Sequence, residues 1–540
     1  MRGAKPTTLI STILGLSLVL LFPNLTQAAA AGKGRYVPGQ LLVKFKAGVP
    51  AYVMAEIHRG IGARVLESLR ADSRLHQVSI PKGWDMEKAL AYYQTRADVQ
   101  YAQPNLIYHI TQTRTNDSLL GYQWAWQNDA TPGADVRATG AWEKAHGRFT
   151  VVVASIDTGV DYLHPDLALN IWTNPGEAGR NCTDGIDNDG NGYGDDCRGW
   201  NFVANNNDPR DDNGHGTHTS GTIGAIGNNG LGVTGANWDV QIMPVKCFDS
   251  GGNGTTVWAI KGIDYALQKG AKILNNSWGT TGYDPALLDA VKRAEAAGAL
   301  FVASAGNGGT DDDTTPFFPC SFSSASFTGT TTPPANILCV AATGANDSRA
   351  WFTSYGPTTV HLGAPGVGIL STVANQSYGF QDGTSMAAPH VTGAAALLKG
   401  CKASLTSSAI KQILLDTARP VLDLSGLTVK GGVVNYEDAV NDVADCDPEP
   451  TNVLPVANPG GPYASNFRKP MQFDGTGSFD PDGQVLIYFW NFGDGTTGVG
   501  PSPAHQYAAG GSYTVTLTVR DNLGGIGSQA TTATMRPTKR

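Results

Sequence analysis

Between residues 112 and 445 the sequence alternates two patterns. Short runs at residues 149–156, 271–276 and 300–305 carry apolar side chains on both faces of an expected strand. Stretches with helical periodicity, such as residues 257–269 and 285–297, separate them. A strand that is apolar on both faces must be covered on both sides, and in parallel sheets the connecting helices provide the cover. The pattern therefore predicts an α/β domain with a mostly parallel sheet between helices.

The segments on either side of this domain have different patterns. Residues 36–110 mix strand-like and helical stretches, which is typical of a small α+β unit. Residues 446–455 have the Pro-rich composition of a linker. Beyond it, alternating apolar residues separated by Asp-Gly and Gly-Gly pairs predict a β-sandwich over residues 456–540. We expect Trp490 to lie in the core of that sandwich rather than on a binding surface.

The N-terminus has the layout of a secretory signal peptide over residues 1–28. Arg2 and Lys5 precede an apolar run at residues 9–22, which small residues follow. This run is shorter than the roughly 20 residues that span a membrane, and no later segment is long and apolar enough to do so. The net charge of −8 argues against a nucleic-acid partner. We therefore expect a secreted, extracellular protein without a membrane span, and we expect it to be a monomer.

The cysteines fit an exported chain, in which thiols can oxidise. Six of the seven fall into pairs that bracket local stretches: Cys182 with Cys197, Cys320 with Cys339, and Cys401 with Cys446. We expect three local disulfides, although the sequence leaves other pairings open. Cys247 lies in an apolar segment with no base beside it, which favours a buried, inert thiol.

Three separate segments each carry a polar reactive residue at a strand or helix end. Asp157 follows a buried strand, His215 lies in a Gly-rich loop at the start of a small-residue helix, and Ser385 lies in the first turn of a long apolar helix. Taken singly, the Asp would be read as a turn cap and the Ser as a helix cap. His215 and His218 could be metal ligands, but a zinc helix would space them four apart around a Glu.

Taken together, the three residues form a complete set for nucleophilic catalysis. A serine hydroxyl becomes a good nucleophile only when a His accepts its proton and an Asp orients that His. Asn307 ends another buried strand among glycines, where Asn is common because it tolerates left-handed backbone angles. Its amide, together with the backbone N–H of Ser385, could also stabilise an oxyanion.

These segments resemble the three signature motifs of the subtilisin-like serine proteases, the subtilases, in that family's Asp, His, Ser order. The resemblance rests on Asp157 with its Thr-Gly, on His215 with its Gly-Thr-His, and on Ser385 within Gly-Thr-Ser-Met-Ala. It implies a three-layer subtilisin-like fold and a secreted endopeptidase that hydrolyses proteins through an acyl-enzyme. By the resemblance, Ser385 is the nucleophile, His215 the general base, Asp157 its orienting partner and Asn307 the oxyanion donor.

The resemblance also implies where a peptide substrate binds. Extended peptide would pair with the backbone of Ser277, Trp278 and Gly279 and with the strand that leads to Gly306. Main-chain pairing tolerates many side chains, so we expect broad specificity. Gly308 places no acid at the edge of the specificity pocket, which favours apolar or aromatic side chains there.

An acidic loop at residues 181–197 is the candidate metal site. Asp187, Asp189 and Asn191 offer oxygen ligands at alternating positions, and Asp196 is the expected closing carboxylate. Arg198 stands where an EF-hand has Glu, so the loop is not an EF-hand. A solvated acidic loop is the alternative, but similar loops in subtilases bind calcium, and we expect structural calcium here. A second, weaker candidate lies near Asp208 and Asp212.

Two flanking modules extend the resemblance. Residues 29–111 look like the inhibitory propeptide of this family, an intramolecular inhibitor that assists folding and is then removed from the peptidase domain at residues 112–445. Residues 456–540 are similar to the polycystic kidney disease type (PKD) domain, an Ig-like sandwich. Two other functions remain open: an adhesive protein with a vestigial protease domain, and a processing protease of narrow specificity that uses the acidic residues 311–313.

Overall fold

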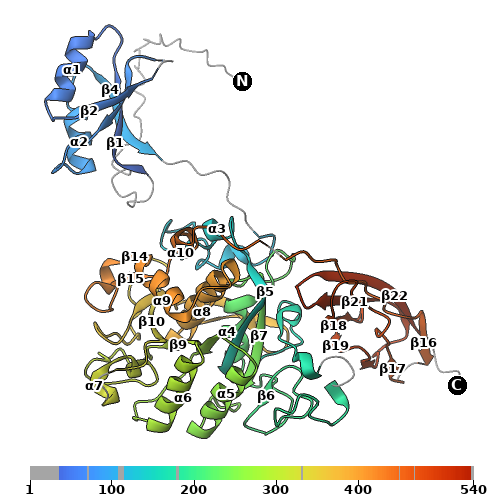
Figure 1. Ribbon diagram of the computed structural model, residues 1–540. Coiled ribbons are helices and arrows are strands. Elements are labelled where there is room, and N and C mark those ends of the chain that lie inside the picture. Colours follow the sequence, from blue (N-terminus) through green and yellow to red (C-terminus); the bar gives the residue numbers. More distant parts are fainter. Residues whose placement is uncertain are drawn as a thin grey trace, which may run out of the picture. The chain divides into compact units, whose positions relative to one another are not determined.

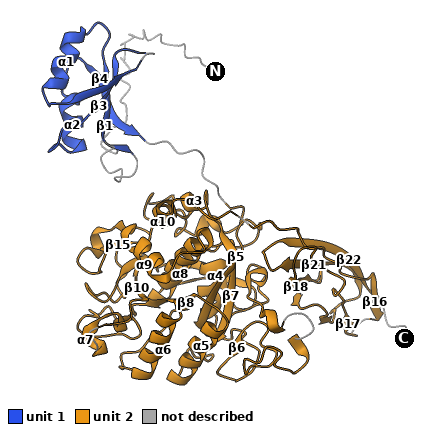
Figure 2. Cartoon of the chain, viewed as in Figure 1, with its two compact units in different colours: residues 1–111 blue, residues 112–540 orange. Residues whose placement is uncertain are grey.

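The computed structural model describes residues 36–69, 72–106, 115–177, 182–329, 332–448, 450–466 and 469–536. The predicted signal peptide, residues 1–28, lies outside the described residues. The chain forms two compact units, residues 1–111 and 112–540 (Figure 2). Within the described ranges, none of the helices combines the length and the hydropathy needed to cross a bilayer.

The first unit is an α+β fold, as its sequence pattern predicts. Its four strands form an antiparallel sheet in the order β2-β3-β1-β4. Alternate residues of β1, Leu41, Val43 and Phe45, are fully buried and pack with Ala89 and Tyr93 of α2. The elements are β1 (Tyr36–Phe45), α1 (Ala51–Arg59), β2 (Arg64–Ser68), β3 (Leu75–Ser79), α2 (Met86–Gln94) and β4 (Val99–Leu106).

A nine-stranded sheet organises the second unit (Figure 1). Its order is β14-β15-β11-β10-β9-β8-β5-β7-β6, and all neighbours are parallel except the edge pair β14 and β15. The strands are β5 (Gly147–Asp157), β6 (Trp200–Asn201), β7 (Asp239–Lys246), β8 (Ile273–Asn276), β9 (Leu300–Ser304), β10 (Ile337–Thr343), β11 (Leu362–Pro365), β14 (Arg419–Pro420) and β15 (Gly432–Val433). A separate hairpin joins β12 (Ile369–Val373) to β13 (Ser377–Gln381).

Helices cover both faces of this sheet, which confirms the α/β prediction. Along β9, Leu300 and Val302 belong to the core under α4, α8, α9 and α10, whereas Phe301 and Ala303 belong to the core under α5 and α6. Because alternate residues face two different cores, β9 carries apolar side chains on both of its faces. The helices are α3 (Ala138–Ala141), α4 (His215–Gly224), α5 (Thr256–Gln268), α6 (Pro285–Ala296), α7 (Ala325–Thr328), α8 (Thr384–Cys401), α9 (Ser407–Asp416) and α10 (Tyr436–Asp442).

The C-terminal part of the second unit is a sandwich of strands. A five-stranded sheet has the order β16-β22-β21-β18-β19, and a second sheet pairs β17 with β20. Trp490 is fully buried between them beside Phe473 and Leu517, as expected. The strands are β16 (Tyr463–Asn466), β17 (Met471–Gln472), β18 (Val485–Asn491), β19 (Thr497–Val499), β20 (Ala504–His505), β21 (Gly511–Asp521) and β22 (Ile526–Arg536).

A buried arginine is one of the residues that join this sandwich to the α/β part. Arg520 in β21 is fully buried. Its guanidinium donates to the carbonyl of Leu169 at 2.9 Å and to Oδ1 of Asn170 at 2.6 Å, and it pairs with Asp239. It also lies 3.9 Å from the centre of the Phe149 ring in β5. The sandwich therefore contacts the strand that ends at Asp157.

The structure contains the three expected local disulfides, Cys182–Cys197, Cys320–Cys339 and Cys401–Cys446. Cys247 is free and fully buried at the end of β7, as expected.

Candidate active site

The candidate catalytic residues meet at the carboxyl edge of the parallel sheet, where ligands bind in open α/β folds. Asp157 is the last residue of β5, Ser277 directly follows β8, and Asn307 lies three residues after β9. Because β5, β8 and β9 are adjacent and parallel, their ends lie side by side. His215 and Ser385 come from the first turns of α4 and α8, two helices that pack against each other.

Asp157 and His215 form a direct pair. Nδ1 of His215 lies 2.7 Å from Oδ1 of Asp157. The Asp157 carboxylate is 2% exposed and also accepts hydrogen bonds from the backbone N–H of Thr158 and from the hydroxyl of Thr219. Burial lowers the pKa of His215, but the charge and hydrogen bond of Asp157 raise it more, so the net pKa lies above its ordinary value. The imidazole is thus oriented and made more basic.

His218 has a different environment from His215. It is fully buried, and its Nε2 lies 2.9 Å from the carbonyl oxygen of Ile369. Burial lowers its pKa to about 4, so it stays neutral. Because His215 uses Nδ1 for Asp157, the two histidines serve separate contacts rather than one metal site.

Ser385 lies in the first turn of α8, next to the end of β8. Its hydroxyl donates to the carbonyl of Ser277 at 3.0 Å, and the hydroxyl of Ser277 donates to the carbonyl of Ser385 at 2.9 Å. Among the described residues, no hydrogen bond joins the Ser385 hydroxyl to His215. The described contacts of the Ser385 side chain are therefore with Ser277.

Two N–H donors converge beside Ser385. The side-chain oxygen of Asn307 accepts from the N–H and the hydroxyl of Thr384 at 2.9 and 2.8 Å, which leaves its amide nitrogen to face the other way. A Cβ built on Gly383 would lie 3.4 Å from that amide nitrogen and 3.5 Å from the backbone nitrogen of Ser385. Only hydrogen occupies that point, so both nitrogens lie beside one small space, which could hold an oxyanion.

The expected substrate-binding residues lie around this point. The N–H of Gly306 donates to the hydroxyl of Thr384 at 3.1 Å. The indole of Trp278 donates to the carbonyl of Ile156 in β5 at 2.9 Å, which fixes the segment that continues to Gly279.

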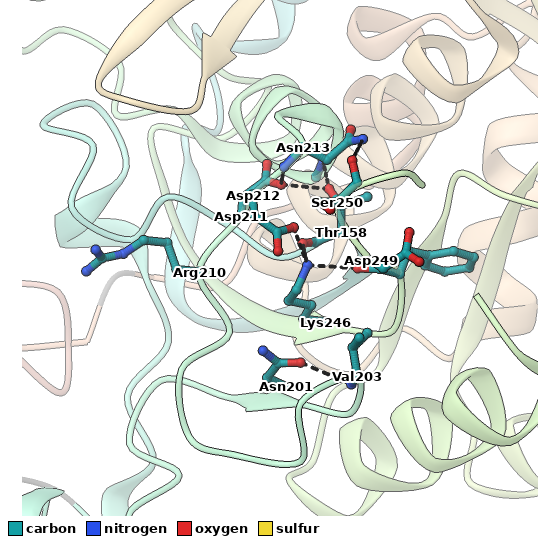
Figure 3. A network of polar contacts seen from close by, with 12 residues as sticks. Thr158, Asn201, Val203, Arg210, Asp211, Asp212, Asn213, Lys246, Asp249 and Ser250 are labelled. Atoms are coloured by element: carbon teal, nitrogen blue, oxygen red, sulfur yellow. Dashed lines mark hydrogen bonds and ion pairs between the residues drawn. The ribbon is translucent and has the colours of Figure 1, made fainter. Parts of the chain in front are cut away.

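A polar network behind the pair was not foreseen from the sequence (Figure 3). Lys246 at the end of β7 is buried, and its ammonium donates to the carbonyls of Thr158 and Phe248 and to the carboxylate of Asp212 at 2.6, 2.8 and 2.6 Å. The neighbouring Asp211 accepts from the hydroxyl of Thr158 at 2.8 Å and from the N–H groups that open α4. A lone Lys at the end of an apolar strand was the only sequence signal.

The weaker cation candidate is not assembled around one point. Asp212 is paired with Lys246, and Asp208 accepts a hydrogen bond from the hydroxyl of Tyr162 at 2.8 Å. Each carboxylate therefore has its own protein partner.

The acidic loop contains a tight carboxylate cluster. Oxygens of Glu177, Asp189 and Asp196 lie within 4.8 Å of one another. Glu177 and Asp196 are fully buried, and Oε2 of Glu177 has no hydrogen-bond partner among the described residues. A buried, unpartnered carboxylate oxygen is costly, and a calcium ion, which prefers oxygen ligands, would satisfy it. The donor set therefore fits calcium.

The sequence prediction included two of the three residues of this cluster. Asp189 and Asp196 belong to it, and the amide of Asn191 donates to Asp196 at 2.9 Å. Asp187 instead accepts from backbone N–H groups of its own loop, those of Asn191 and Gly192. Glu177 lies upstream of the loop, and no spacing pattern connects it to the loop residues. Lys269 of the segment after α5 contacts Asp189 and supplies a positive charge there.

Comparisons with known proteins agree with this geometry. Residues 149–445 match the Subtilase family, residues 23–105 the Fervidolysin N-terminal prodomain, and residues 452–536 the PKD domain. The chain is 32% identical over 448 residues to the Thermophilic serine proteinase of Bacillus sp. (strain AK1), with 79% of this chain and 98% of the relative covered. It is 34% identical over 302 residues to Thermitase of Thermoactinomyces vulgaris, with 56% and 92% covered. The chain therefore belongs to the subtilase family and is a subtilisin-like serine endopeptidase with an N-terminal prodomain and a C-terminal PKD domain.

Proposed function

We propose that this protein is an exported endopeptidase that hydrolyses extracellular proteins with broad specificity through Asp157, His215 and Ser385. The observation that carries the proposal is the convergence of the Asn307 amide and the Ser385 N–H beside the Ser385 side chain, close to the Asp157–His215 pair. An N-cap serine needs neither a basic imidazole nor two inward-facing donors.

The proposed mechanism has two half-reactions. After the Ser385 hydroxyl rotates away from Ser277, His215 Nε2 accepts its proton while Oγ attacks the peptide carbonyl carbon. The carbonyl oxygen becomes an oxyanion between the Asn307 amide and the Ser385 N–H. The C–N bond then breaks, and His215 returns the proton to the leaving amine. Water, deprotonated by His215, hydrolyses the resulting ester and restores the Ser385 hydroxyl.

Asp157 acts only through the imidazole. Its carboxylate accepts the Nδ1–H of His215, so the lone pair of the neutral ring stays on Nε2, where the proton must arrive. Its charge then stabilises the imidazolium that forms in each half-reaction.

Calcium is proposed as a structural ion at Glu177, Asp189 and Asp196. When bound, it would add to the positive charge that Lys269 supplies to Asp189 and Asp196, and it would give the unpartnered oxygen of Glu177 a partner. Tyr265 of α5 donates its hydroxyl to Asp196 at 2.7 Å, so the ion would tie the acidic loop to the helix layer. The site lies outside the reacting groups and takes no part in the chemical steps.

The N-terminal regions are proposed to control export and activity. Residues 1–28 would direct export, and the prodomain would inhibit its own peptidase domain until it is cleaved off. Parallel sheets form slowly because their contacts are distant in sequence, which gives a folding template a kinetic role.

Self-processing provides the test. The full chain and a Ser385→Ala variant would be expressed with export, and the products followed by intact mass and by casein hydrolysis. Ser408→Ala is a matched control, because Ser408 is also the second residue of a helix and lies exposed on α9. We expect the wild type and Ser408→Ala to lose the prodomain and digest casein, and Ser385→Ala to do neither. Full processing and hydrolysis by Ser385→Ala would contradict the proposal.

A further inference from the structure

Two glycines face each other next to the nucleophile. Asn276 of β8 pairs in register with Ala303 of β9, and Gly279 and Gly306 each follow three residues later. Both glycines lie beside α8, because Ser277 exchanges hydrogen bonds with Ser385 and Gly306 donates to Thr384. Side chains are thus missing from both strand ends at the point nearest the reacting hydroxyl.

The ring of Phe317 occupies the space that these glycines leave. A Cβ on Gly279 would lie 2.3 Å from Cε1 of this ring, and a Cβ on Gly306 would lie 3.0 Å from Cδ1 of the same ring. One aromatic side chain therefore contacts both strand ends at once. Any side chain larger than hydrogen at Gly279 would displace it.

The backbone around Phe317 is held in place on both sides. The N–H of Phe317 donates to the hydroxyl of Ser321, and its carbonyl accepts from the N–H of Ser321, both at 2.9 Å. The next residue, Phe318, pairs with Thr280 through two backbone hydrogen bonds of 2.7 and 2.8 Å. These bonds hold the backbone from which the Phe317 ring enters the space between the glycines.

The position of the space between Gly279 and Gly306 indicates which part of a substrate it would hold if the Phe317 ring were absent. When a substrate carbonyl places its oxygen between the Asn307 amide and the Ser385 N–H, the side chain of the same substrate residue begins two bonds from the carbonyl carbon. The space between Gly279 and Gly306 lies next to the same serine. It is therefore where the residue on the acyl side of the scissile bond would place its side chain.

We propose that Phe317 limits this residue to small side chains, so that the enzyme cleaves after Gly, Ala or Ser and disfavours large aromatic residues there. The inference rests on the proposed function, and it replaces the apolar or aromatic preference expected from Gly308 with a preference for small side chains. Specificity at the other substrate positions stays broad, because it depends on main-chain pairing. A filled site excludes a large side chain sterically, so we expect a discrimination of at least about tenfold, the lower end of what one methylene group contributes in an apolar site.

Two chromogenic peptides that differ at one residue provide the test. Succinyl-Ala-Ala-Pro-Ala-p-nitroanilide and succinyl-Ala-Ala-Pro-Phe-p-nitroanilide would be compared by kcat/KM for the mature wild type, Phe317→Gly and Tyr283→Ala. Tyr283 is a matched control, since its ring packs on Phe318 and Phe322 on the other side of the same loop. The concentration of active sites is measured by titration with a small phosphonofluoridate. Its reaction with the serine does not depend on the space between Gly279 and Gly306.

We expect the wild type and Tyr283→Ala to prefer the Ala substrate by about tenfold or more. Phe317→Gly should raise kcat/KM for the Phe substrate by about tenfold or more and change the Ala value by less than about threefold. A wild type that cleaves the Phe substrate as fast as the Ala substrate would overturn the proposal, even if the variant failed to fold. An unchanged ratio in titratable Phe317→Gly would also overturn it.

The same experiment separates this inference from the proposed function. A wild type that reacts with the phosphonofluoridate and cleaves both peptides equally keeps the proposed function and refutes the role of Phe317. A wild type that does not react refutes the proposed function, and the inference fails with it.

Discussion

Replacing Asp157 by Asn tests whether the carboxylate of Asp157 makes the His215 imidazole an effective base. The carboxylate accepts from His215 at 2.7 Å through Oδ1, and the same oxygen accepts the N–H of Thr158 at 2.7 Å. The amide of Asn carries no charge, so it cannot stabilise the imidazolium that forms when His215 takes the proton of Ser385. We expect kcat to fall by about 10⁴-fold, the size of effect seen when a triad Asp becomes Asn, or about 5.4 kcal/mol at 1.36 kcal/mol per tenfold.

The same variant makes a prediction about pH. The base must be neutral, so kcat/KM of the wild type falls as pH drops through the pKa of His215, which Asp157 raises above its ordinary value. Removing the negative charge removes stabilisation of the imidazolium, so the pKa falls. In the plot of kcat/KM against pH, the acid limb of Asp157→Asn should therefore lie at lower pH than that of the wild type. The plateau value of kcat/KM should also be lower.

The assay is kcat/KM against pH with a small peptide anilide, from pH 5 to 9. Because a slow variant also removes its prodomain slowly, the fraction of mature chain is measured by intact mass before rates are compared. Asp289→Asn, an exposed acid on α6, is the control and should match the wild type. A plateau within tenfold of the wild type, or an acid limb that does not move downward, would refute the reasoning.

Three further predictions concern single contacts. Asn307→Ala should lower kcat by about 10²- to 10³-fold with little change in KM, measured by steady-state kinetics, because one oxyanion donor is lost; an unchanged kcat would contradict the assignment. Chelation of calcium should lower the midpoint of thermal unfolding, and Glu177→Gln should reduce that calcium-dependent change, as followed by calorimetry with and without the ion. Arg520→Met should destabilise the contact between the sandwich and the α/β part by about 3 kcal/mol, because the buried Asn170 oxygen and the Leu169 carbonyl lose their donor; equal thermograms would show that the contact contributes little.

The parts of the fold that the sequence predicted depend on local patterns. The strand at residues 300–304 carries apolar side chains on both of its faces. Both faces therefore had to be covered by other elements, wherever the strand lay in the sheet. Cys182 and Cys197 are joined across one short loop, so their pairing needed no knowledge of distant contacts. The candidate catalytic motifs could be proposed because each chemistry needs a particular residue type.

Other features depend on contacts between segments that are distant in sequence. Glu177 and Asp196 belong to one carboxylate cluster although they are far apart in the sequence. Lys246 contacts Thr158 because β5 and β7 are neighbouring strands. Only the order of the strands in the sheet determines that they are neighbours. Phe317 contacts Gly279 and Gly306 from a third segment. The sequence alone does not predict these contacts, because none of these residues has a fixed spacing in the sequence to its partners.

The central claim is that Ser385 is the activated nucleophile of a self-processing protease. The most direct measurement is intact mass of the exported protein in calcium buffer before and after reaction with a phosphonofluoridate, followed by peptide mapping. The account predicts one adduct, on Ser385, in a chain that has lost its prodomain. A folded, processed chain that forms no adduct, or forms it on another residue, would contradict the account.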